Sequence, residues 1–211
     1  MKNTFKYDCY THCKEGTLTA TESILDLLNT LDGNMFDGLI LTDTNSYKGY
    51  KFYDENMRHM FSYMGIIKGI EYDTSDLGKT IVITPSNVKL DILTCRGLSA
   101  PQLLDIVHDY GGIVGSTIDT NDYDFDFYMN CKNRKSLGGS NCHNFNSIGE
   151  SYSEFEKKIY NEDEFIAYIK ENRPYTSEIN TKSSNNPLYR IHNKIQSIIH
   201  YPRRIKLLKK I

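Results

Sequence analysis

The spacing of apolar residues along the chain predicts short strands alternating with helices. Runs with the length and composition of buried strands occupy residues 2–9, 36–42, 65–71, 79–84, 91–94 and 113–116. Apolar residues at helical spacing predict helices over residues 21–31, 100–110 and 162–170. Residues 121–133 are aromatic and acidic, and we interpret them as a loop. This alternation favours an α/β fold with a mostly parallel sheet.

Polar side chains suited to metal binding or acid–base chemistry follow several of these strands. They are Asp8, His12, Asp43, Glu71, Asp119 and His143. In parallel α/β folds the loops after the carboxyl ends of the strands form the active site. The sequence therefore predicts that these residues, far apart along the chain, meet in one cleft.

The same residues lie in motifs that resemble those of the PHP (polymerase and histidinol phosphatase) family, in the family's order. Residues 8–13 read Asp-Cys-Tyr-Thr-His-Cys where the family has Asp-Leu-His-x-His-Thr, and residues 42–45 read Thr-Asp-Thr-Asn for Thr-Asp-His-Asn. The family's Gly-Ile-Glu is intact at 69–71 and its His-x-x-Gly-Gly at 108–112. Residues 139–143 read Gly-Ser-Asn-Cys-His for Gly-Ser-Asp-Ala-His.

The resemblance covers roughly residues 4–175 and implies a distorted (β/α)7 barrel. The stretch from Asp119 to Ser140 is short for the family, which suggests that one late strand–helix unit is reduced or missing. The family hydrolyses phosphoesters with a cluster of up to three metal ions. Such ions lower the pKa of a bridging water and hold the attacking and leaving oxygens.

Three residues stand where the family places metal ligands, namely His12, Glu71 and His143. Two His and one Glu form a known type of zinc site with an open position, and imidazole also suits Mn and Fe. The resemblance thus implies at most one divalent ion, with an empty polar pocket as the open alternative. Asp43 or Asp119 would complete the coordination shell or act as a base.

Four other ligand positions of the family have changed. Tyr10, Thr44 and Ile118 replace His, and Asn141 replaces Asp. Because Ile cannot bind a metal and the others bind one poorly, a full trinuclear cluster is not expected. Two functions remain open. One is a phosphoesterase with a reduced metal site that acts on a phosphomonoester or phosphodiester; the other is a catalytically inactive binding or scaffold protein.

The formal net charge of −2 conceals an uneven distribution of charge. Residues 179–211 hold eight of the 25 Lys and Arg residues and none of the 27 acidic ones, so this segment carries +8 and residues 1–178 carry −10. We therefore expect a PHP-like domain over 1–178 and a basic, partly helical tail over 179–211. The tail suits an anionic membrane surface or a second protein, whereas an acidic body argues against nucleic acid.

The sequence predicts neither a transmembrane helix nor a signal peptide. No run of about 18 apolar residues predicts a transmembrane helix, and the first ten residues lack the apolar stretch of a signal peptide. We expect a cytoplasmic protein, with peripheral membrane contact through the tail as an open alternative. The phosphoesterase hypothesis implies a phosphorylated small molecule or another phosphoester as the substrate.

Overall fold

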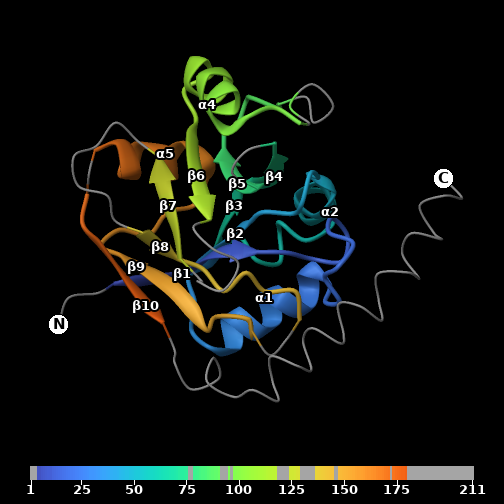
Figure 1. Ribbon diagram of the computed structural model, residues 1–211. Helices are drawn as coiled ribbons and strands as arrows, with labels where there is room; N and C mark the ends of the chain where they lie inside the picture. The colour runs from blue at the N-terminus through green and yellow to red at the C-terminus, as the bar shows by residue number, and fades with distance from the viewer. Residues whose placement is uncertain are drawn as a thin grey trace, which may run out of the picture.

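The computed structural model describes residues 4–75, 78–90, 95, 97–117, 124–128, 136–144, 147–171 and 173–179. The predicted strand over 91–94, the site residue Asp119 and the tail beyond residue 179 lie outside the described residues. Two five-stranded sheets form the centre of the molecule, and helices cover their outer faces (Figure 1).

The first sheet has the order β10-β9-β1-β2-β3. Its strands are β1 (Phe5–Thr11), β2 (Gly38–Leu41), β3 (Gly65–Lys68), β9 (Ser151–Phe155) and β10 (Tyr175–Ile179). The pairs β1–β2 and β2–β3 are parallel, as the sequence predicts for this half of the chain. The strands β9 and β10 extend the sheet in antiparallel register, with Phe5 opposite Phe155.

The second sheet has the order β4-β5-β6-β7-β8, and all its pairs are antiparallel. Its strands are β4 (Ile70–Thr74), β5 (Gly78–Ile83), β6 (Ile113–Thr117), β7 (Asp124–Tyr128) and β8 (Ser136–Gly138). The run predicted as one strand over 65–71 is divided at Gly69, so that β3 belongs to one sheet and β4 to the other.

The predicted (β/α)7 barrel is therefore wrong. Parallel neighbours need a crossover of a dozen or more residues, whereas only residues 75–77 separate β4 from β5. A connection this short forces antiparallel pairing, and the second sheet continues in that manner. The described strands form two open sheets rather than one closed ring. The predicted loop over 121–133 is also wrong, because β7 occupies 124–128.

The four helices that the structure describes are α1 (Ile24–Gly33), α2 (Lys48–Asn56), α4 (Ala100–Asp109) and α5 (Glu162–Lys170). The helix predicted over 21–31 begins later, at Ile24, because Ser23 and Asp26 form a reciprocal capping box. Ser99 and Gln102 form the same motif at α4. The helix predicted over 162–170 is confirmed, and Asn161 caps it by accepting a hydrogen bond from the Glu164 N–H.

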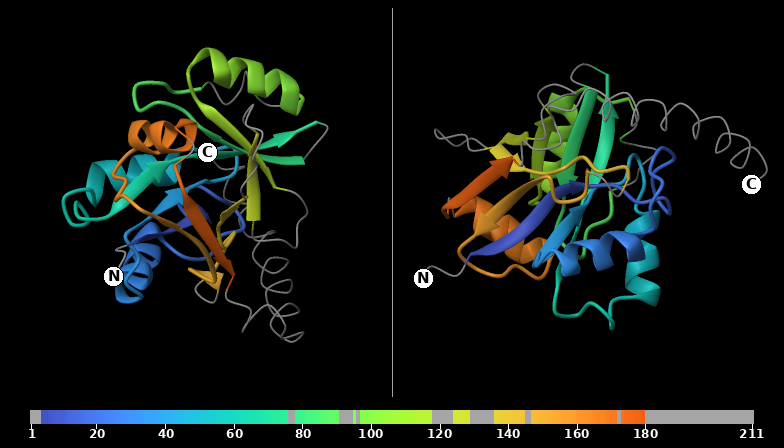
Figure 2. Two further views of the ribbon diagram at one scale, coloured as in Figure 1. Left: turned by 90° about the vertical axis from the view of Figure 1, so that its left-hand side faces the viewer. Right: turned by 90° about the horizontal axis from the view of Figure 1, so that it is seen from below.

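Three apolar clusters stabilise this arrangement. The largest includes Tyr7 of β1, Phe155 of β9 and Phe165 of α5, together with residues of β5 and β6 from the second sheet. A second cluster packs α1 and α2 against the parallel strands, and a third packs α4 against β4, β5 and β6. In Figure 2, α4 and α1 lie on opposite sides of the molecule, with the sheets between them. No helix in the described ranges is both long and apolar enough to cross a membrane.

Candidate functional site

The three residues predicted as metal ligands lie together where the two sheets meet. His12 follows β1, Glu71 lies in β4 and His143 follows β8 along the chain. Isolated bridges join Thr11 to Cys142 and Thr44 to Glu71, which brings these segments side by side. The His12 Nε2 atom lies 3.5 Å from Glu71 Oε2. The rings of His12 and His143 stack with their centroids 4.4 Å apart.

The Glu71 carboxylate is fully buried and both of its oxygens have protein partners. Thr44 donates a hydrogen bond to Oε1 at 2.8 Å, and the Tyr10 hydroxyl donates to Oε2. The ammonium group of Lys79, from the neighbouring strand β5, lies 3.1 Å from Oε1. Glu71 is therefore neutralised by a lysine of the same chain and held by two hydroxyl groups.

His12 is fully buried, and both of its ring nitrogens lie near polar atoms. Its Nε2 lies 3.5 Å from Glu71 Oε2 and 3.2 Å from Asn141 Oδ1. Its Nδ1 lies 3.4 Å from Thr17 Oγ1, which donates its own proton to Asp43. Burial, together with the nearby charge of Lys79, lowers the pKa of His12 to about 3, so the ring is neutral.

The substituted family positions contact the retained ones. Tyr10 and Thr44, which stand in place of His, both donate to Glu71. Asn141, which stands in place of Asp, has its Oδ1 3.2 Å from His12 Nε2. A network of protein hydrogen bonds therefore connects the residues where the family places metal ligands.

Asp43, predicted as a catalytic or metal-binding acid, is a buried structural carboxylate. Its Oδ1 accepts from the Cys13 N–H at 2.8 Å and the Thr17 hydroxyl at 2.9 Å, and its Oδ2 accepts from the Cys13 thiol. Burial raises its pKa to about 6, against the effect of these hydrogen bonds. A Cβ atom at Gly16 or Gly49 would lie 2.0 or 2.1 Å from Oδ2, so the glycines make room for this carboxylate.

Asp8 plays a similar part at the other side of β1. Its carboxylate accepts hydrogen bonds from the Ser140 N–H at 2.8 Å and the Gly149 N–H at 2.9 Å. The fully buried Asp8 therefore attaches the segment after β8 to β1, which positions His143. The motif at residues 8–13 singles out Asp8 in the sequence, but it does not reveal that this carboxylate holds the backbone of a distant segment.

Lys79 is the residue of this site that the sequence reasoning missed. It lies in the predicted strand over 79–84, and nothing in the local pattern distinguishes it from a solvent-facing lysine of an exposed strand. Only the pairing of β4 with β5 places it beside Glu71.

These donors do not fit the metal cluster that the family implies. Both oxygens of Glu71 have protein partners, and the Asp43 carboxylate accepts hydrogen bonds from Cys13 and Thr17. A cation bound at Glu71 would also lie next to the Lys79 ammonium group. Within the described ranges no group of three His, Cys, Asp or Glu side chains is arranged to hold a metal ion.

Three comparisons place this fold among known proteins. No curated protein matches the chain. PsfC from Pseudomonas syringae PB-5123 has a similar structure, with a TM-score of 0.62 at 15% identity over 92% of this chain and 98% of that chain. Endonuclease Q, solved with a 27-mer duplex that carries an abasic lesion at the active site, gives a TM-score of 0.60 at 13% identity. The lesion-specific endonuclease PfuEndoQ from Pyrococcus furiosus gives 0.57 at 12% identity.

The chain covers 58% of each endonuclease chain, which in turn match 82% and 83% of this chain. At these identities the structural similarity establishes the fold alone. A family model described as PHP-associated matches residues 128–174 of the sequence. This match, over residues 128–174 alone, agrees with the PHP resemblance that the motif order predicts.

Proposed function

We propose that the chain is a PHP-type protein that acts by binding a ligand or partner and not by metal-dependent hydrolysis. The observation that supports this proposal is the ion pair between Lys79 and the buried Glu71. In the family the corresponding glutamate serves as a metal ligand. Here a lysine ammonium group supplies the positive charge that the buried carboxylate needs.

The polar groups around this ion pair remain available for recognition. Thr19, Thr44, Asn141 and His143 are all partly exposed, and Lys79 keeps 35% of its side chain accessible. Partly exposed donors and acceptors of this kind suit a polar ligand or a segment of a partner. The basic tail, which lies outside the described residues, would add a second contact surface.

A hydrolase with a reduced metal site is the second candidate. The observation in its favour is that His12, Glu71 and His143 lie together. In such an enzyme these three side chains would hold one ion, which would activate a water molecule when bound. That state requires the Lys79 ammonium to leave Glu71.

Metal analysis of the full-length protein distinguishes these functions. We would incubate it with Zn²⁺ or Mn²⁺, dialyse it, and measure the retained metal and the hydrolysis of p-nitrophenyl phosphate and bis-p-nitrophenyl phosphate. We expect less than stoichiometric metal and no hydrolysis. The Lys79→Met variant should retain more Zn²⁺ than the wild type, because the competing ammonium is gone. Stoichiometric metal together with an activity that Glu71→Ala abolishes would overturn the proposal.

A further inference from the structure

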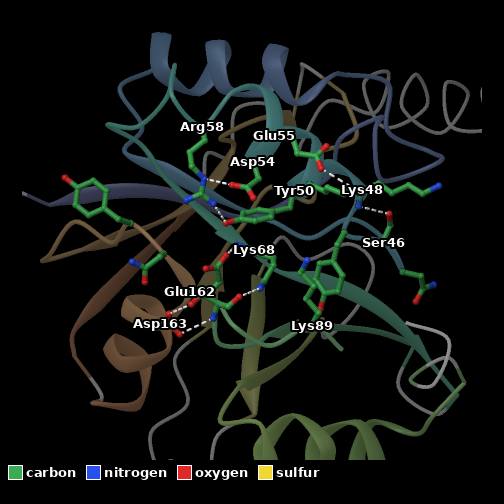
Figure 3. Close-up of a pocket in the computed structure, with 16 residues that line it drawn as sticks. Ser46, Lys48, Tyr50, Asp54, Glu55, Arg58, Lys68, Lys89, Glu162 and Asp163 are labelled. Carbon is green, nitrogen blue, oxygen red and sulfur yellow. Dashed lines mark hydrogen bonds and ion pairs between the residues drawn. The ribbon is translucent and has the colours of Figure 1, made fainter. Parts of the chain in front are cut away.

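A cavity of about 640 Å³ lies apart from the Glu71 site, between α2, the turn after β5 and the start of α5 (Figure 3). Its volume is typical of small-molecule sites, which range from roughly 300 to 1,000 Å³. The segment between β2 and α2 lies between this cavity and the Glu71 site. Thr44 of this segment contacts Glu71, whereas Ser46 and Tyr47 of the same segment line the cavity together with Tyr50 of α2.

The acidic side chains that line this cavity already have partners. Asp54 pairs with Arg58, Glu55 with Lys51, and Asp163 accepts two hydrogen bonds from Ser86. Glu162 accepts the backbone N–H of Lys68 at 2.7 Å. Arg58 and Lys51 thus neutralise Asp54 and Glu55, whereas Glu162 and Asp163 accept hydrogen bonds from neutral groups and attract Lys68.

Lys68 and Lys89, which also line the cavity, form no close ion pair with a described carboxylate. Lys68 is only 5% exposed, and its ammonium group donates to the carbonyl oxygens of Ser86 and Val88, at 3.2 and 3.3 Å. An ammonium group has three donors, so one N–H of Lys68 remains. Within the part of the chain that the structure describes, neither Lys68 nor Lys89 has a carboxylate within 4 Å.

The two ammonium groups also lie close enough to repel each other. Burial lowers the pKa of Lys68, the charge of Glu162 opposes this shift, and the positive charge of Lys89 adds to it. Figure 3 shows Lys68 near the middle of the cavity, with Lys89 beside it and the first turn of α5 on the other side. An anion between the two ammonium groups would relieve this repulsion and use the remaining donors.

We propose that this cavity binds a small molecule through a dianionic group of the phosphate monoester type, held between Lys68 and Lys89. A phosphate monoester offers three acceptor oxygens to the two ammonium groups, whereas a carboxylate offers two. The cavity is larger than a phosphate ion, which leaves room for an organic part of the ligand against Tyr50. The proposal for this cavity does not depend on the function proposed for the Glu71 site.

Calorimetric titration of the full-length protein tests the proposal. The probes are phenyl phosphate, inorganic phosphate, benzoate and phenol. We expect saturable binding of phenyl phosphate, weaker binding of inorganic phosphate, and little binding of the monoanion benzoate or of neutral phenol. Benzoate that binds as tightly as phenyl phosphate, or an absence of saturable phenyl phosphate binding, would contradict the proposal.

Three variants locate the site. Lys89→Ala removes an exposed side chain and should weaken phenyl phosphate binding about tenfold or more, as expected for the loss of a charge-assisted hydrogen bond. Lys157→Ala removes the same charge from an exposed position outside the cavity and should leave the affinity within about twofold. Lys79→Met should also leave it unchanged. Equal losses in Lys89→Ala and Lys157→Ala would indicate nonspecific attraction, and loss in Lys79→Met would place the ligand in the Glu71 cleft.

Discussion

Replacing Lys79 by Met tests whether this lysine neutralises the buried Glu71. The carboxylate is fully buried, and the two charged atoms lie 3.1 Å apart. With an effective dielectric constant near 20, two unit charges at this distance attract by about 5 kcal/mol, before desolvation is subtracted. Removal of one partner from a fully buried pair costs about 3–5 kcal/mol. Because the Lys79 side chain is 35% exposed, solvent screening reduces the expected loss to about 2–3 kcal/mol.

Urea unfolding at neutral pH measures this loss, and a double-mutant cycle with Glu71→Gln isolates the pair. The double variant should be more stable than Lys79→Met alone, because no charged group then remains buried without its partner. Lys51→Met is the matched control, since its ion pair with Glu55 is largely exposed and should contribute less than about 1 kcal/mol. If Lys79→Met costs no more than this control, or if the two single changes add within about 0.5 kcal/mol, the neutralisation argument fails.

Three further predictions concern the frame of the site. Burial raises the pKa of Asp8 from 3.8 to about 6, so the folded chain binds its proton more tightly and stability falls as pH rises from about 4 to 6. This group accounts for up to about 3 kcal/mol of that fall, and Asp8→Asn should remove its contribution in urea titrations across this range; an unchanged slope would refute the assignment. Gly149→Ala should cost about 1–2 kcal/mol, because φ is +71° and a Cβ would lie 2.8 Å from Phe36, whereas Gly33→Ala meets no atom within 4 Å and should be neutral or stabilising in thermal melts. Ser99→Ala should cost about 1 kcal/mol of stability by removing the cap of α4, and an unchanged melting temperature would contradict that role.

Several elements could be predicted because their patterns are local. The apolar runs and caps around α1, β2 and α5 depend on residues within one or two turns. The barrel prediction failed because it relied on strand order and gave no weight to connection length. The gap between the runs over 65–71 and 79–84 is too short for a crossover helix, which already favours an antiparallel pair.

The strand β7 was missed although its residues alternate with the period of a strand. Its sequence Asp-Phe-Asp-Phe-Tyr alternates polar and aromatic residues with period two, which is typical of a strand with two different faces. Acidic residues are depleted in strands, and this composition led to the interpretation as a loop.

The candidate site could be predicted as a location but not as a chemical state. His12, Glu71 and His143 meet because motif order and topology bring them together. The partners of Glu71 depend instead on the register of β4 with β5, where Glu71 stands opposite Ile81 and Lys79 opposite Asp73. A shift of register by one residue would reverse the faces of these side chains, and one sequence does not define that register.

The central position of β1 has a consequence for the synthesis of the chain. β1 is made before the other described strands of its sheet, yet one of its neighbours is β9, and the Tyr7 hydroxyl donates to the carbonyl of Ile159, 152 residues later. At about 5–20 residues per second, a ribosome needs roughly 8 to 30 seconds to add these residues. During that interval β1 can pair with β2 at one edge. The backbone N–H and C=O groups at its other edge, where β9 later pairs, have no partner strand. The nascent chain therefore presents an unpaired strand edge, the type of surface that chaperones protect and that aggregation exploits.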